Sequence, residues 1–125
     1  MTPIRTAEIL AVGTELLTPF RVDTNSLYLT EQLNSLGIDV RSKIVVGDDT
    51  ADLADRLRQS LARADLVVAT GGLGPTSDDV TREVVAEVLD LPLIENAALL
   101  ESIRSRFERR GLHMPDANRR QAAVY

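Results

Sequence analysis

The sequence contains no cysteine, which excludes disulfide bonds, thiol nucleophiles and cysteine-ligated zinc or iron–sulfur sites. Aromatic residues make up only 3% and tryptophan is absent, so the core must be aliphatic and no stacking platform for single-stranded nucleic acid is available. No apolar run approaches the ~20 residues of a membrane-spanning helix. The first residues also lack the apolar region and cleavage site of a secretory signal. We therefore expect a cytoplasmic protein with neither a membrane nor a nucleic-acid partner.

Basic residues are also fewer than acidic ones, 14 against 19, and the formal net charge is −5. This balance argues against a protein that binds a nucleic-acid backbone, but it does not exclude a small anionic ligand held by amides and a metal. The apolar share of 44% and the charged share of 26% are ordinary for a globular protein. The length of 125 residues allows one domain with a real core.

What the sequence does contain is an alternation of short apolar runs and amphipathic segments. The apolar runs predict strands at residues 7–13, 38–48 and 65–70. Leucine and valine at helical spacing predict helices over residues 23–37, from about residue 50, over 77–89 and over 96–111. Residues 91–95 fit either a short strand or an extended connector. Strands that alternate with helices predict an α/β fold, with a parallel sheet covered on both faces.

The chain ends on "RRQAAVY", an apolar segment without a terminator, as if a further strand were beginning. We therefore expect residues 1–125 to form a single domain that is incomplete at its C-terminus.

Three loops follow the predicted strands, and ligands of open parallel sheets bind beyond the carboxyl ends of the strands. The loops contain Gly13-Thr14-Glu15, Gly47-Asp48-Asp49 and the segment from Gly71 to Asp79. In the third loop Gly71, Gly72 and Gly74 let backbone amides approach a ligand, and a helix beginning at Thr76–Ser77 points its free N–H groups to the same place. We expect a phosphate or pyrophosphate there. The alternative is a tight strand–helix connection without a ligand, because the loop lacks the Lys-Ser/Thr of a P-loop.

Asp48 and Asp79 both lie at this edge, so we expect their carboxylates to meet across the pocket. Two carboxylates suit Mg²⁺, which usually keeps several waters and shares substrate phosphates. The alternative is that an aspartate at a helix start is a cap, and for Asp49 and Asp78 we favour the cap. Thr76 followed by Asp79 also matches a capping box.

The remaining polar residues of these loops allow two interpretations each. Thr14 is suited to donate to a phosphate, whereas Glu15 and Asn25 belong either to the pocket or to the local turn and helix start. The sole histidine, His113, is predicted on the surface, outside the cluster, which excludes a Ser-His-Asp triad.

The segments "VGTELL", "VDTNS", "VVGDD" and "TGGLGPTSDDVTRE" resemble the amino-terminal domain of the CinA (competence/damage-inducible protein A) family, which is similar to the molybdopterin-binding MoaB/MogA domains. The resemblance runs from Ala7 through "MPDANRRQA". It implies a three-layer α/β/α fold with a mostly parallel sheet. It also implies functional aspartates at Asp48 and Asp79, and a phosphate-holding loop made of Gly71, Gly72, Gly74 and Thr76.

The same resemblance implies metal-dependent hydrolysis of ADP-ribose to AMP and ribose 5-phosphate. The alternative is a non-catalytic module that binds molybdopterin or a nucleotide phosphate. The family's separate domain with nicotinamide mononucleotide deamidase activity is not in this sequence. The resemblance further implies that the domain continues beyond "RRQA". Because an incomplete sheet exposes an edge, we also expect oligomerisation, as a homo-oligomer when the protein is complete. This chain departs from many relatives at Asp23, where they have an amide side chain.

Overall fold

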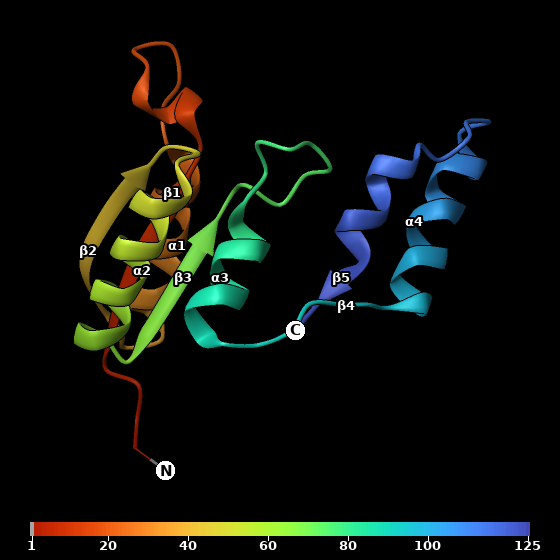
Figure 1. Cartoon of the computed structure of the whole chain (residues 1–125). Helices are drawn as coiled ribbons and strands as arrows, with labels where there is room; N and C mark the ends of the chain where they lie inside the picture. Colours follow the sequence, from red (N-terminus) through yellow and green to blue (C-terminus); the bar gives the residue numbers. More distant parts are fainter. Residues whose placement is uncertain (1) are drawn as a thin grey trace.

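The computed structural model describes residues 2–125, which form an α/β structure (Figure 1). The first part alternates strands and helices: β1 (Thr6–Val12), α1 (Thr24–Ser35), β2 (Asp39–Val46), α2 (Thr50–Arg63), β3 (Leu66–Thr70) and α3 (Thr81–Leu89). The second part contains β4 (Ile94–Glu95), α4 (Ala97–Arg109) and β5 (Ala123–Val124). Two 3₁₀ helices complete the chain, η1 (Thr14–Leu17) and η2 (Asp116–Ala122).

The main sheet is parallel, with the strand order β2-β1-β3. β1 is the central strand and is buried along almost its whole length, which explains its continuous apolar run. Val12 pairs with Val46 of β2, and Ala11 pairs with Thr70 of β3. The three strands therefore end at the same edge of the sheet, as the sequence predicted.

Helices cover both faces of this sheet. On one face Ile9 packs with Leu33 of α1, and on the other Val12 packs with Leu53 of α2 and Val84 of α3. Side chains of β1 alternate between the two clusters because successive residues of a strand point to opposite faces. The predicted three-layer arrangement is confirmed, and Figure 1 shows α1 and α2 on opposite sides of the strands.

Side-chain caps fix three of the predicted helix starts. The carboxylates of Asp23 and Asp49 and the amide of Asn96 each accept a hydrogen bond from the backbone N–H three residues later, at 2.9–3.0 Å. Asp23 is thus the N-cap of α1. Gly37 and Gly111 follow α1 and α4 with φ of +79° and +71°, the left-handed conformation that ends a helix.

The start of α3 differs from the prediction, because the helix begins at Thr81 and not at Ser77. The predicted partners Thr76 and Asp79 do meet: Thr76 N donates to Asp79 Oδ2 at 3.0 Å, and Asp79 N donates to the Thr76 carbonyl at 3.1 Å. These bonds close a separate turn before the helix. Val80 occupies the N-cap position without a side-chain cap, so the cap predicted for Asp78 is wrong.

The second part of the chain forms its own small unit. β4 and β5 pair antiparallel, with Ile94 opposite Val124, so residues 94–95 form a strand and the apolar end of the chain forms another. The helix α4 packs against η2 and has no buried residue, although its apolar spacing resembles that of a helix covering the main sheet. Within residues 2–125, no helix combines the length and apolar character needed to cross a bilayer.

Candidate functional site

The loops that follow β1, β2 and β3 converge at the carboxyl edge of the main sheet. Gly13 N donates to the Val46 carbonyl at 2.8 Å, which continues the pairing of the first two strands into their loops. On the other side, a Cβ added at Gly71 would lie 2.1 Å from the Val12 carbonyl oxygen. The predicted meeting of the three loops is therefore confirmed.

Thr14 and Asp48 connect the first two loops. The Thr14 hydroxyl donates to Asp48 Oδ2 at 3.0 Å, and the same Oγ1 accepts from Asp48 N at 3.1 Å. Because β1 is central, this contact draws the Asp48 carboxylate toward the middle of the edge. Neighbouring strands lie about 5 Å apart, so Asp48 and the loop after β3 are separated by about 10 Å at their strand ends.

The glycines of the third loop are required by close packing. Gly71 and Gly72 have φ of +83° and +65°, a region that other residues rarely adopt. A Cβ at Gly72 would lie 2.1 Å from Thr81 Oγ1, and one at Gly74 would lie 2.5 Å from Asp79 Oδ2. The loop is thus pressed against β1, α3 and its own aspartate, which only glycine permits.

The carbonyl groups of this loop are turned toward the protein. The Gly71 carbonyl accepts from Thr81 Oγ1 at 2.8 Å, and the Gly72 carbonyl accepts from Thr81 N at 3.2 Å. Arg82 donates to the Leu73 carbonyl at 2.8 Å. In a trans peptide the N–H points opposite to the C=O, so the N–H groups that follow these carbonyls face the other way. Backbone amides arranged on one side of a loop form an anion-binding concavity.

Asp79 lies inside this loop, and its carboxylate is held by Thr76. Oδ2 accepts from Thr76 Oγ1 at 2.7 Å and from Thr76 N at 3.0 Å. The bond from the Thr76 hydroxyl, with smaller help from the Thr76 and Gly74 amides, lowers the pKa of Asp79 below its ordinary value, although burial opposes this. Asp79 is therefore ionised at neutral pH, and the donors of Thr76 that we expected to serve a phosphate serve this carboxylate.

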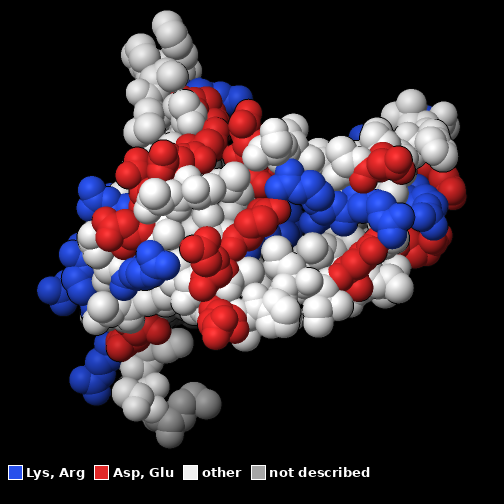
Figure 2. All heavy atoms as spheres, viewed as in Figure 1, with Lys and Arg blue, Asp and Glu red and all other residues white. Residues whose placement is uncertain are grey.

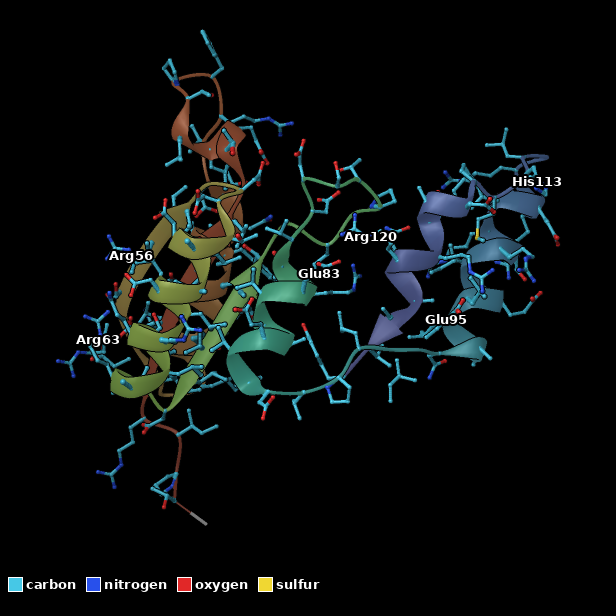
Figure 3. All side chains as sticks on the ribbon, viewed as in Figure 1. Arg56, Arg63, Glu83, Glu95, His113 and Arg120 are labelled. Atoms are coloured by element: carbon cyan, nitrogen blue, oxygen red, sulfur yellow. The ribbon has the colours of Figure 1, made fainter. Side chains whose placement is uncertain are left out.

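The other predicted residues lie around the same edge. Glu15 is in η1, and its carboxylate lies so close to Gly13 that a Cβ there would come within 2.5 Å of it. Asn25 is exposed in the first turn of α1, and Ser77 is exposed in the glycine loop. His113 lies beyond the far end of α4, away from this edge, as predicted (Figure 3).

Two arginines that the sequence did not single out contact the glycine loop. Arg82 from the first turn of α3 binds the Leu73 carbonyl, and Arg120 from η2 binds the Thr76 and Asp79 carbonyls, the latter at 3.0 Å. Because Arg82 follows the glycine loop directly in the sequence, its contact with the loop could have been predicted. Arg120 is 41 residues from Asp79, and no local pattern indicates its contact.

Charge is unevenly distributed around the site. Figure 2 shows acidic side chains gathered over the upper left of the molecule, where the strands end in Figure 1, and a band of basic side chains across the C-terminal part. Among residues 2–125, no group of three or more His, Cys, Asp or Glu side chains is placed to hold a metal. Asp48 and Asp79, the two carboxylates predicted to hold a metal, lie on separate loops of this edge.

The chain matches the protein family described as "Probable molybdopterin binding domain" over residues 8–124. It is 55% identical over 118 residues to a CinA-like protein of Solibacter usitatus and 54% identical over 118 residues to one of Koribacter versatilis. Each match covers 94% of this chain and 28% of the relative, so the chain spans little more than a quarter of these relatives.

Solved structures agree with this relationship. The protein CinA from Thermoplasma acidophilum matches with a TM-score of 0.86 and 31% identity, over 96% of this chain and 70% of that one. A molybdopterin biosynthesis protein from Mycobacterium abscessus matches with a TM-score of 0.65 and 27% identity, over 88% and 68% of the two chains. The chain therefore belongs to the molybdopterin binding domain family and is a CinA-like member of it.

Proposed function

We propose that the carboxyl edge of the sheet binds a phosphorylated small molecule and that, in the natural protein, it hydrolyses ADP-ribose to AMP and ribose 5-phosphate. The observation that supports this most is the orientation of the glycine loop. Its carbonyls at Gly71 and Gly72 accept bonds from Thr81, so the N–H groups of Gly72 and Leu73 face the opposite side. An array of N–H groups beside two carboxylates fits a ligand that is anionic and also binds a cation.

Because the carboxylates of the edge repel an anionic ligand, a bound cation is needed to neutralise this repulsion. Asp48 and Asp79 would hold Mg²⁺, because two hard carboxylate donors suit an ion that completes its shell with water and substrate phosphates. When bound, the cation supplies neutralisation of phosphate charge and activation of water. Thr14 orients Asp48 through its hydroxyl, and Thr76 orients Asp79 in the same way.

In the reaction, the oxygen of a water attacks one phosphorus of the pyrophosphate, and the bond from that phosphorus to the bridging oxygen breaks. The attacking water loses a proton, and the leaving phosphate keeps the bridging oxygen. That proton passes to one of the two carboxylates, Asp48 or Asp79, which then acts as the general base. The loop amides stabilise the charge that develops on the phosphate oxygens.

A second function is favoured by one observation. The Asp79 carboxylate already accepts from the hydroxyl and the amide of Thr76, inside the loop that is expected to hold a phosphate. An aspartate that only shapes the loop would leave a binding module without turnover. Such a module would hold a pterin or nucleotide phosphate, and one solved relative is named as a molybdopterin biosynthesis protein.

The test is an assay for AMP and ribose 5-phosphate released from ADP-ribose by the protein expressed from its natural gene, with Mg²⁺ and with a chelator. We expect Asp48→Asn and Asp79→Asn each to lower turnover by about 100-fold or more, and the chelator to abolish it. Asp49→Asn is the matched control, because Asp49 caps α2 by accepting from Asp52 N at 2.9 Å.

Full turnover by Asp79→Asn would contradict the hydrolytic mechanism. Tight binding of a pterin phosphate without hydrolysis of ADP-ribose would favour the binding module. Thermal melting of each variant separates loss of chemistry from loss of fold, since Asp79 also shapes its loop.

A further inference from the structure

Arg120 reaches from η2 to the glycine loop, and Figure 3 shows its side chain beside Glu83. Its guanidinium donates to the Thr76 carbonyl, to the Asp79 carbonyl at 3.0 Å and to Glu83 Oε1 at 2.6 Å. Thr76 and Asp79 are the two residues whose side chains bond to each other within the loop. A single side chain thus contacts both ends of the turn that contains Asp79.

The two carbonyls that Arg120 binds determine the direction of two N–H groups. The Thr76 carbonyl accepts from Arg120 and also from Asp79 N at 3.1 Å. Because C=O and N–H are antiparallel in a trans peptide, these two contacts turn the Ser77 N–H to the opposite side. The Asp79 carbonyl fixes the Val80 N–H in the same way. The planar fork of an arginine suits this contact, since several donors hold a fixed relative geometry.

A purely structural explanation is that Arg120 docks η2 onto α3 through its ion pair with Glu83. The neighbouring residue provides a comparison. Arg119 forms a two-point ion pair with Glu95, with bonds of 3.1 and 3.0 Å, and this pair joins η2 to β4. Arg120 differs because two of its three acceptors are carbonyls of the glycine loop. An ion pair alone needs neither of them.

We propose that Arg120 is a positioning residue for ligand binding: by holding the Thr76 and Asp79 carbonyls, it directs the Ser77 and Val80 amides toward a phosphate. The nature of the ligand rests on the proposed function, but the orienting contact does not. The inference also gives the unit formed by β4, α4, η2 and β5 a role at the site, because it supplies the arginine.

The experiment uses ¹⁵N-labelled protein expressed from its natural gene, titrated with inorganic pyrophosphate and Mg²⁺ and followed by amide NMR. We expect pyrophosphate to shift the Ser77 and Val80 amide signals of the unaltered protein. Arg120→Gln should weaken binding by about 10-fold or more and remove these two shifts. Arg119→Gln is the matched control and should leave both the affinity and the shifts unchanged.

Arg120→Lys separates positioning from docking. A lysine keeps the positive charge beside Glu83 but replaces the fork by a single ammonium. We therefore expect a melting temperature close to that of the unaltered protein, with the weakened binding of Arg120→Gln.

The proposal would be overturned if Arg120→Gln bound pyrophosphate as tightly as the unaltered protein. It would also be overturned if Arg120→Lys restored both pyrophosphate binding and thermal stability. Absence of any pyrophosphate shift at Ser77 in the unaltered protein would overturn it as well. ADP-ribose hydrolysis measured on the same samples tests the proposed function independently. If pyrophosphate binding depends on Arg120 but ADP-ribose is not hydrolysed, the proposed hydrolysis is wrong and the role of Arg120 in binding still holds.

Discussion

The Thr14 hydroxyl donates to the Asp48 carboxylate across 3.0 Å and so joins the loops that follow two neighbouring strands. The same hydroxyl oxygen accepts from Asp48 N at 3.1 Å, so one side chain fixes both the carboxylate and the backbone of its partner. Gly47 lies against this contact, since a Cβ there would be 3.3 Å from Thr14 Oγ1. Asp48, which lies in the loop after β2, is thereby oriented by a residue of the loop after β1.

Replacing Thr14 by valine removes this orienting hydroxyl while keeping the shape of the side chain. If Asp48 holds the cation, we expect Thr14→Val to lower Mg²⁺ affinity or turnover by about 10–100-fold, the usual effect of removing an orienting partner of a metal ligand. Thr14→Ser keeps the hydroxyl and should retain activity. The measurement is ADP-ribose hydrolysis as a function of Mg²⁺ concentration. Equal Mg²⁺ dependence in both variants would show that the contact is dispensable.

The glycine loop makes a prediction about stability that is independent of ligand binding. Gly71 combines φ of +83° with a predicted clash of 2.1 Å against the Val12 carbonyl oxygen. Gly37 has a similar φ of +79° but nothing within 4 Å of an added Cβ. Gly37→Ala should therefore cost about 1–2 kcal/mol of unfolding free energy, the penalty for a left-handed residue.

Gly71→Ala should cost distinctly more than Gly37→Ala, because the backbone of the loop must also move away from β1, which adds about 1–3 kcal/mol. Urea unfolding of the two variants measures the difference. Equal losses would mean that the loop moves freely away from the central strand.

The carboxyl edge of the sheet could be predicted from the sequence, because the residues that mark the end of each strand are close together in the chain. Short apolar runs ended by glycine mark the three strands, and parallel strands must end at one edge. The pair Thr76 and Asp79 was also recognisable from its spacing, but the spacing does not tell whether the turn continues into a helix. In the structure the Thr81 hydroxyl and N–H bond back to the glycines, so α3 starts there.

Long-range relationships were not predictable. The apolar spacing of α4 is the same whether the helix covers the main sheet or packs on η2, so the pattern fixes the helix and not its neighbour. Arg120 belongs to a run of basic residues in which nothing distinguishes it from Arg119. Only the fold separates the arginine that contacts the glycine loop from the one that pairs with Glu95.

A buried carboxylate on the central strand provides a further prediction. Glu8 is 3% exposed, and its Oε1 accepts from Ser60 Oγ at 2.8 Å and from Arg63 at 2.9 Å. Ser60→Ala removes a fully buried hydrogen-bond donor to the buried Glu8 side chain, so we expect a loss of about 1–3 kcal/mol of unfolding free energy. Ser35→Ala is the control, because the Ser35 hydroxyl donates to a carbonyl at the exposed end of α1.

Denaturant unfolding of the two serine variants makes the comparison. The Ser35→Ala change should stay within about 0.5 kcal/mol. A similarly small loss for Ser60→Ala would indicate that Arg63 alone stabilises the Glu8 carboxylate.

The hydrogen bonds of Asp65 allow a prediction of how the free energy of unfolding depends on pH. Its Oδ2 accepts from Arg5 N at 2.9 Å, from Thr6 N at 3.1 Å and from the Thr6 hydroxyl at 3.3 Å, which ties the start of β1 to the start of β3. The Arg5 amide first, and then the Thr6 amide, lower the pKa of Asp65 below its ordinary value. A lowered folded-state pKa gives stability that is fully present above the unfolded-state pKa and is lost as the pH falls through the folded-state value.

Asp65→Asn removes the charge but keeps an acceptor oxygen, much as protonation does. We therefore expect the variant to be less stable than the unaltered protein at pH 7, with the gap closing as the pH falls below about 4, where aspartate protonates. Urea unfolding at a series of pH values measures the gap. A gap of the same size at pH 7 and pH 3 would mean that the ionised carboxylate does not stabilise this end of the sheet, since protonation of the aspartate would then leave the difference unaltered.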